Sequence, residues 1–173
     1  ALDVDTATIE LALAQLVSER RLDAYAKTYH LPSHSIDVSE KDRRLLACAI
    51  AVLSKKSSTP PSLHQVANYI GVEVSSLKRV FKIAVRLGDV IVIEKNRYLP
   101  KSELKRLAIV AEKLAARASD GKFTSAEYRD EVNLGRNFVI AVLEYFDRKG
   151  FTVQKNGRRS VRCSPDSVFT VKR

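Results

Sequence analysis

Hydrophobic residues first recur at helical spacing and then alternate with polar residues, in a pattern that occurs three times along this chain. In the clearest copy, apolar residues lie three and four apart over 136–149, and the run ends at Gly150, which favours a left-handed helix cap. Residues 151–155 then alternate apolar and polar up to the pair Asn156-Gly157, which is typical of a tight hairpin turn. The pattern predicts a helix followed by a β-hairpin.

Two further copies of this pattern precede it. In residues 75–100 an apolar helical stripe ends at Gly88, and the stretches VIVIE and RYL follow as strands. In residues 7–32 an apolar helical stripe is followed by two short apolar stretches before Pro32. Each copy therefore predicts the same local order of helix and hairpin.

Helix start signals predict additional helices upstream of the second and third hairpins. Ser62 with Gln65, and Thr124 with Glu127, have the spacing of capping boxes and open short helices. A longer apolar helical pattern precedes each of these short helices. Residues 39–100 and 101–163 thus share one predicted order: long helix, short helix, longer helix and two strands.

Three helices and a hairpin in about 60 residues are typical of the winged-helix arrangement, in which the hairpin packs beside a helix-turn-helix as a wing. We therefore predict a mainly α fold with small β-hairpin wings, built from tandem winged-helix domains. Residues 1–38 are predicted to be the C-terminal part of one such domain, 39–100 a complete domain, and 101–173 the C-terminal domain. The chain contains no methionine, which, with the incomplete first copy, predicts a fragment of a longer protein.

Positive charge is concentrated in the last two thirds of the chain. The net charge is +10, but residues 1–38 carry 3 basic against 6 acidic residues, 39–100 carry 11 against 5, and 101–173 carry 16 against 9. Such a distribution favours an anionic partner, a nucleic acid or a membrane surface, over a merely solvated surface.

The cysteine count and the length of the apolar runs limit the cellular compartment and the partners that this chain can have. Two cysteines, Cys48 and Cys163, make no disulfide framework, and Cys48 in an apolar helical run is expected to be a buried thiol. The apolar runs fall far short of the roughly 20 residues that span a bilayer. A reducing compartment, the cytoplasm, and no membrane partner are therefore expected. We also expect a monomer.

The sequence offers little for catalysis. His30, His34 and His64 are scattered, and Pro32 prevents the first two from sharing a helical face, so no metal site is predicted. Neither common glycine-rich phosphate loop occurs. We expect that this stretch of chain is not an enzyme and binds no cofactor.

A nucleic-acid site is predicted where charge coincides with the ligand-facing parts of the last winged helix. In that arrangement the third helix presents its first residues and the wing grips the backbone. Arg136 and Asn137 are the predicted base readers, Arg129 a further phosphate contact, and Tyr128 either a stacking residue or a side chain packed against the third helix. The predicted wing cations are Lys155, Arg158, Arg159 and Arg162.

The middle copy has a basic helix face of its own. Lys78, Lys82 and Arg86 lie four residues apart, opposite the apolar stripe, and Arg79 lies nearby. This face is either a second surface that contacts phosphates or an ordinary polar face, and the sequence favours neither.

The choice between DNA and RNA comes from a resemblance in the last copy. The stretch FTSAEYRDEVNLGRNFVIAVLEYFDRKGFTVQKNGRRSVR, residues 123–162, resembles the C-terminal winged helix of the bacterial SelB family, the selenocysteine-specific elongation factors. The likeness is strongest in F-T-x-A-E-x-R-D, in the GR that opens the third helix, in LEYFDRKGFT, and in the wing with GRR. It is close over about 40 residues, and the tandem architecture extends it more weakly across the chain.

The resemblance implies that this chain binds a messenger-RNA stem-loop, the selenocysteine insertion (SECIS) element beside a UGA codon. It implies a translational GTPase in an N-terminal part outside this sequence, holding GTP and magnesium and carrying selenocysteinyl-tRNA to the ribosome. It places RNA contacts at Arg129, Gly135, Arg136, Asn137 and the wing around Arg158 and Arg159. The family often has lysine where Asn137 stands, which leaves the loop sequence open. The alternatives are a DNA-binding transcriptional regulator and a protein-interaction module.

Overall fold

The computed structural model describes residues 5–19, 21–25, 28–30, 38–55 and 59–169. Two compact units are present, Ala1–Ser39 and Glu40–Arg173. The first contains α1 (Thr6–Ser18), whose N-cap Asp5 accepts a hydrogen bond from the backbone N–H of Thr8, and an antiparallel hairpin of β1 (Asp23–Tyr25) and β2 (Thr28–His30). The predicted helix and hairpin are thus both present, and the assignment of this unit to an incomplete winged helix stays a prediction.

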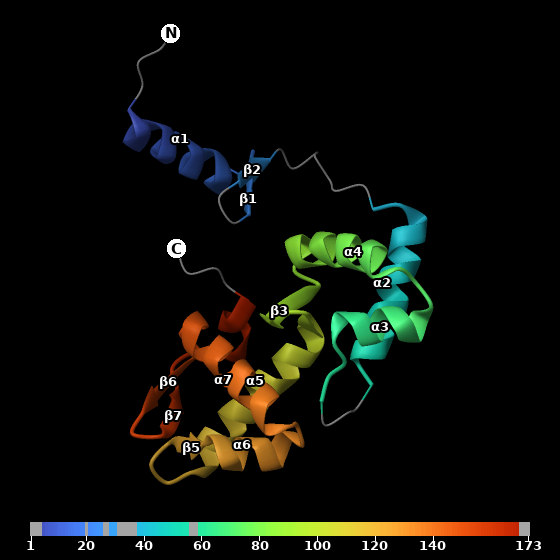
Figure 1. Cartoon of the computed structure of the whole chain (residues 1–173). Coiled ribbons are helices and arrows are strands. Elements are labelled where there is room, and N and C mark those ends of the chain that lie inside the picture. Colours follow the sequence, from blue (N-terminus) through green and yellow to red (C-terminus); the bar gives the residue numbers. More distant parts are fainter. Residues whose placement is uncertain (1–4, 20, 26–27, 31–37, 56–58, 170–173) are drawn as a thin grey trace. The chain divides into compact units, whose positions relative to one another are not determined.

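The second unit holds two successive sets of three helices and a hairpin, which confirms the predicted fold class (Figure 1). The elements of the first set are α2 (Glu40–Leu53), α3 (Leu63–Ile70), α4 (Val74–Leu87), β3 (Val90–Glu94) and β4 (Arg97–Pro100). The elements of the second set are α5 (Lys101–Arg117), β5 (Lys122–Thr124), α6 (Ser125–Val132), α7 (Arg136–Lys149), β6 (Thr152–Lys155), β7 (Arg158–Val161) and the short 3-10 helix η1 (Pro165–Phe169).

Local signals in the sequence set the ends of these helices as predicted. Both capping boxes form, at Ser62 before α3 and at Thr124 before α6. Gly150 takes the left-handed conformation that ends α7, with φ of 70°. The turn between β6 and β7 has positive φ at both Asn156 and Gly157, which is the backbone that a two-residue hairpin of the predicted type requires.

Two elements of the last winged helix were not predicted. The strand β5 pairs with β7, so that the wing is a three-stranded sheet in the order β5-β7-β6 with β7 in the centre. The helix η1 packs on α5 and α7, burying Val168 completely, and Lys105 on α5 forms an ion pair with Asp166 at 2.7 Å. A wing with a central strand bonded on both sides is held more rigidly than a free hairpin.

Each winged helix buries a core of its own, and the hairpin of the middle one takes part in both. The middle core consists of Ala49, Leu53, Leu63, Val66, Ala67, Leu77 and Phe81. The last core is larger and is built mainly from α5, α6 and α7, but Ile93 of β3 and Leu99 of β4 belong to it. The helix α5 starts directly after β4, with Pro100 as its N-cap. The division at residue 100 stays a prediction, because residues 40–173 form one compact unit.

The thiol of Cys48 is exposed, so the prediction that it is buried was wrong. The face of α2 that meets the middle core carries Leu45, Leu46, Ala49 and Leu53, and position 48 lies outside that stripe. Among the residues that the structure describes, no helix combines the length and the apolar character needed to cross a membrane.

Candidate nucleic-acid interface

The start of α7 presents the two predicted base readers to solvent. The helix-turn-helix turn passes through Asn133, which ends α6 in the left-handed conformation, and Gly135, which is the N-cap of α7. Arg136 and Asn137 are both exposed. No ion pair to Arg136 is found within the described part of the chain, so its five N–H donors are available to a ligand. The free backbone N–H groups at this helix end also favour an anion.

The wing supplies three further exposed or half-exposed cations. Lys155 lies at the end of β6 and Arg162 just after β7, and both side chains are exposed. Arg158 is tied down more firmly: its Nη1 lies 3.1 Å from the carboxylate of Asp120, and its Nη2 donates to the Lys122 carbonyl at 2.9 Å. The tip of the wing is therefore basic and held against the loop that precedes β5.

Arg159 does not lie on this surface, and the sequence-based prediction that it holds the RNA backbone was wrong. It is 4% exposed. Its Nε lies 3.0 Å from Asp147 of α7, its Nη1 donates to the hydroxyl of Ser125, and its Nη2 donates to the side chain of Gln154. Arg159 faces inward because residues along a strand alternate in direction and Arg158 takes the outer position. Its guanidinium therefore anchors the wing to α6 and α7.

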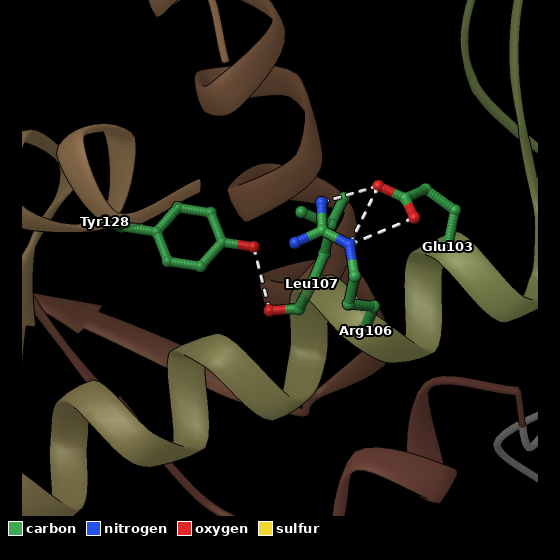
Figure 2. Close-up of polar contacts among 4 residues, drawn as sticks. All are labelled: Glu103, Arg106, Leu107 and Tyr128. Carbon is green, nitrogen blue, oxygen red and sulfur yellow. Dashed lines mark hydrogen bonds and ion pairs between the residues drawn. The ribbon is translucent and has the colours of Figure 1, made fainter. Parts of the chain in front are cut away.

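Tyr128 is also a structural residue. Its ring is completely buried, and its hydroxyl donates to the Leu107 carbonyl of α5 at 2.9 Å (Figure 2). Arg106 and Glu103, which are paired with each other, lie beside this contact (Figure 2). Burial raises the pKa of Tyr128 far above the ordinary value, although the nearby Arg106 opposes this shift. Burial excludes the stacking on an RNA base that the sequence left open.

Tyr128→Phe is expected to lower the free energy of unfolding by about 1 to 2 kcal/mol, because a buried carbonyl loses its hydroxyl partner. RNA affinity of the folded protein is expected to stay unchanged. Urea unfolding followed by circular dichroism measures the first effect, and Tyr69→Phe, at an exposed tyrosine of α3, serves as the control. A loss of RNA affinity at unchanged stability would restore the stacking interpretation.

Arg129 lies on α6, the helix that precedes the predicted readers in the chain. Its guanidinium forms an ion pair with Asp130 at 2.7 Å and is partly exposed. The same helix begins with the capping box, in which the backbone N–H of Thr124 donates to Glu127 and lowers the pKa of that carboxyl. Arg129 therefore reaches solvent, but with its charge partly neutralised by its neighbour.

The middle winged helix forms a second wall beside the start of α7. A cavity of about 280 Å³ is lined on one side by Thr59, Glu94 and Arg97 and on the other by residues 135–138. Sequence reasoning missed these three residues, because they are distant in sequence from α7 and belong to no basic run. The predicted readers thus stand in a hollow rather than on an open helix end.

The basic face of α4 is present as predicted from the helical spacing. Lys78, Lys82 and Arg86 are exposed. Arg79 differs, because it is engaged in a two-point ion pair with Asp42 of α2, at 2.8 and 2.9 Å. Within the described ranges, no group of three or more histidine, cysteine, aspartate or glutamate side chains is placed to hold a metal ion.

Comparison with known proteins agrees with this architecture. The family described as "Elongation factor SelB, winged helix" matches residues 115–161. The selenocysteine-specific elongation factor of Haemophilus influenzae is 25% identical over 148 residues, which cover 86% of this chain and 24% of that protein. The Escherichia coli factor is 24% identical over 158 residues, 91% of this chain and 25% of that protein. The chain thus spans about a quarter of the length of these relatives.

A solved structure extends the likeness from sequence to fold. The mRNA-binding domain of elongation factor SelB from E. coli, solved in complex with SECIS RNA, superposes with a TM-score of 0.62 at 25% identity. The match covers 72% of this chain and 99% of that domain. The family model, the sequences and the fold agree, and they confirm the resemblance seen in the sequence: this chain is similar to the C-terminal winged-helix region of SelB, the selenocysteine-specific elongation factor.

Proposed function

We propose that this chain is the messenger-RNA-binding part of a selenocysteine-specific elongation factor and binds a SECIS stem-loop. The observation that carries the proposal is the match to the SelB domain solved with SECIS RNA, taken with the exposed Arg136 and Asn137 at the start of α7. Winged helices also bind duplex DNA, but both the family match and the structural match favour RNA over a transcriptional regulator.

In this proposal the wing and the helix start have separate tasks. Arg136 and Asn137 read unstacked loop bases, since RNA is recognised in sequence through splayed single-stranded bases rather than through its narrow major groove. Lys155, Arg158 and Arg162 hold the phosphate backbone. These three contacts position the RNA without carrying sequence information.

The binding of RNA serves the whole protein through tethering. An N-terminal GTPase with bound GTP and magnesium would carry selenocysteinyl-tRNA, and the stem-loop would hold it next to one UGA codon on the ribosome in the cytoplasm. Tethering raises the effective concentration of the tRNA at that codon without any new contact to it. The present chain acts in this scheme as a monomeric binding module and performs no chemistry.

The proposal is tested by titrating the chain with hairpin RNAs at about 0.15 M salt. A pool of hairpins with the E. coli SECIS stem and a randomised loop is first selected against the chain. The selected hairpin is then compared with a loop-scrambled version and with duplex DNA. We expect binding of the selected hairpin at least 100-fold tighter than binding of the other two, and equal weak binding of all three would overturn the proposal.

Salt dependence provides an independent measurement on the same hairpins. Three cations in contact with phosphate (Lys155, Arg158 and Arg162) are expected to give a slope of log K against log salt of about −2 to −3. The scrambled hairpin should bind more weakly at every salt concentration but with a similar slope, because phosphate contacts do not depend on loop sequence. A slope near zero for the selected hairpin would contradict the assignment of these cations.

A further inference from the structure

The middle hairpin, β3 and β4, is packed into both winged helices. Tyr98 on β4 contacts Phe81 of the middle core edge to face, with ring centroids 4.9 Å apart. Ile93 and Leu99, on the same two strands, are buried in the last core. The two strands therefore bridge α4 and the elements α5 and α7 (Figure 1). Because apolar contacts fix it on both sides, this hairpin is a rigid joint rather than a mobile wing.

The joint sets one acidic side chain in the hollow beside the predicted base readers. Glu94 and Arg97 flank the turn of the hairpin and line the cavity of about 280 Å³ that residues 135–138 close from the other side. The Nε of Arg97 lies 3.0 Å from Oε1 of Glu94, and its Nη1 donates to the Pro60 carbonyl at 2.6 Å. Arg97 is thus fixed at two points, and it fixes the carboxylate in turn.

Glu94 can accept a hydrogen bond from a ligand in the hollow without repelling the RNA backbone. The guanidinium of Arg97 neutralises its charge, so the pair adds little to the field that reaches a phosphate backbone. The ion pair uses Oε1, which leaves Oε2 as an acceptor. A carboxylate accepts hydrogen bonds and donates none. A group that enters the hollow beside Glu94 must therefore present N–H or O–H donors.

We propose that this hollow receives one unstacked base of the RNA loop, and that Glu94 makes it selective for a base whose edge carries donors. The inference rests on the proposed function and extends the reading site from the last winged helix to the middle one. Guanine fits best, because its N1–H and N2 amino group lie side by side. Uracil fits worst, because its single edge donor, N3–H, lies between two carbonyl oxygens that repel the carboxylate, which is discrimination by repulsion.

The opposite wall completes such a site. Arg136 can lie against the face of a splayed base, as arginine does in single-stranded RNA recognition, and Asn137 offers both a donor and an acceptor. Phe138, which also lines the hollow, is buried. In such a site the middle winged helix reads the edge of the base through Glu94, and the last winged helix supports the face of the base through Arg136.

The test uses the selected hairpin with each of the four bases placed in turn at each loop position. We expect one position at which guanine is preferred over uracil by at least tenfold. Glu94→Gln is expected to reduce that ratio about tenfold, which corresponds to about 1.4 kcal/mol, and to leave the preferences at other positions unchanged. Glu112→Gln, at an exposed glutamate of α5, is the matched control and should change neither.

Inosine provides a measurement on the unaltered protein, which does not depend on how well the variant folds. Inosine lacks the N2 amino group of guanine. Replacing guanine by inosine at that one position should therefore weaken RNA binding by the wild type about fivefold or more, and should weaken RNA binding by the Glu94→Gln variant little. The inference is overturned if inosine costs nothing at every loop guanine, or if Glu94→Gln changes all hairpins equally, which is a charge effect only. Failure of the wild type to distinguish any loop would instead overturn the proposed function itself.

Discussion

Arg136→Ala is expected to weaken binding of the selected hairpin by about 1 to 3 kcal/mol and to weaken the scrambled hairpin far less. The physical reason is the position of the residue. Its guanidinium is exposed at the first position of α7, and its donors can bond a base edge or cover a base face. Loop discrimination should therefore fall together with affinity.

Fluorescence anisotropy with both hairpins measures this effect. Arg43→Ala removes an exposed arginine from α2 and serves as the charge-matched control, which should leave loop discrimination intact. Thermal unfolding of Arg136→Ala should match the wild type, since the Arg136 side chain forms no hydrogen bond or ion pair within the described part of the protein. If Arg136→Ala weakened selected and scrambled hairpins equally, Arg136 would be a phosphate contact rather than a base reader.

Arg159→Ala is expected to act on stability instead, lowering the free energy of unfolding by about 2 to 4 kcal/mol. Removal of one partner from a buried ion pair costs about 3 to 5 kcal/mol, and the lower range applies because the Asp147 side chain is still 26% exposed. The loss also frees the hydroxyl of Ser125 and the amide of Gln154 from their shared partner. The wing should then detach from α6 and α7 before the rest of the unit unfolds.

Urea unfolding and RNA titration together separate this role from direct binding. Where Arg159→Ala is still folded, the salt slope of RNA binding should equal that of the wild type. Arg158→Ala, at the neighbouring outward position, should show the opposite pattern: a slope smaller by about one with little change in stability. If Arg159→Ala had normal stability and its salt slope of RNA binding fell by about one, Arg159 would be a phosphate contact rather than a structural residue.

The two arginines of the wing illustrate where sequence reasoning failed. Arg158 and Arg159 are identical in type and adjacent, and a basic hairpin tip predicts that both contact phosphate. Their separation depends on β5, a strand of three residues too short to give a periodic signal. Once β5 pairs with β7, Phe123 lies opposite Arg159, and the inner face of the strand is closed to solvent.

Sequence reasoning left two roles open for Tyr128 and did not identify Glu94, for a related reason. The burial of Tyr128 depends on α5, which supplies the carbonyl that its hydroxyl contacts 21 positions away. Glu94 reaches the start of α7 only because Ile93 and Leu99 are buried in a core that belongs to the next winged helix. Both placements arise from packing between segments far apart in the chain, which periodicity and capping signals do not report.

The sequence by itself determined the local order of this protein. Hydrophobic periodicity, two capping boxes and an Asn-Gly turn are properties of a few consecutive residues, and they specify helices and hairpins before any packing takes place. The exposed start of α7 at Arg136 followed from the same signals. Only the tertiary structure decided which charged side chains are buried and which are exposed, because burial depends on contacts between distant segments: it buried Arg159 within the wing, and it set Glu94 in the same hollow as Arg136 and Asn137.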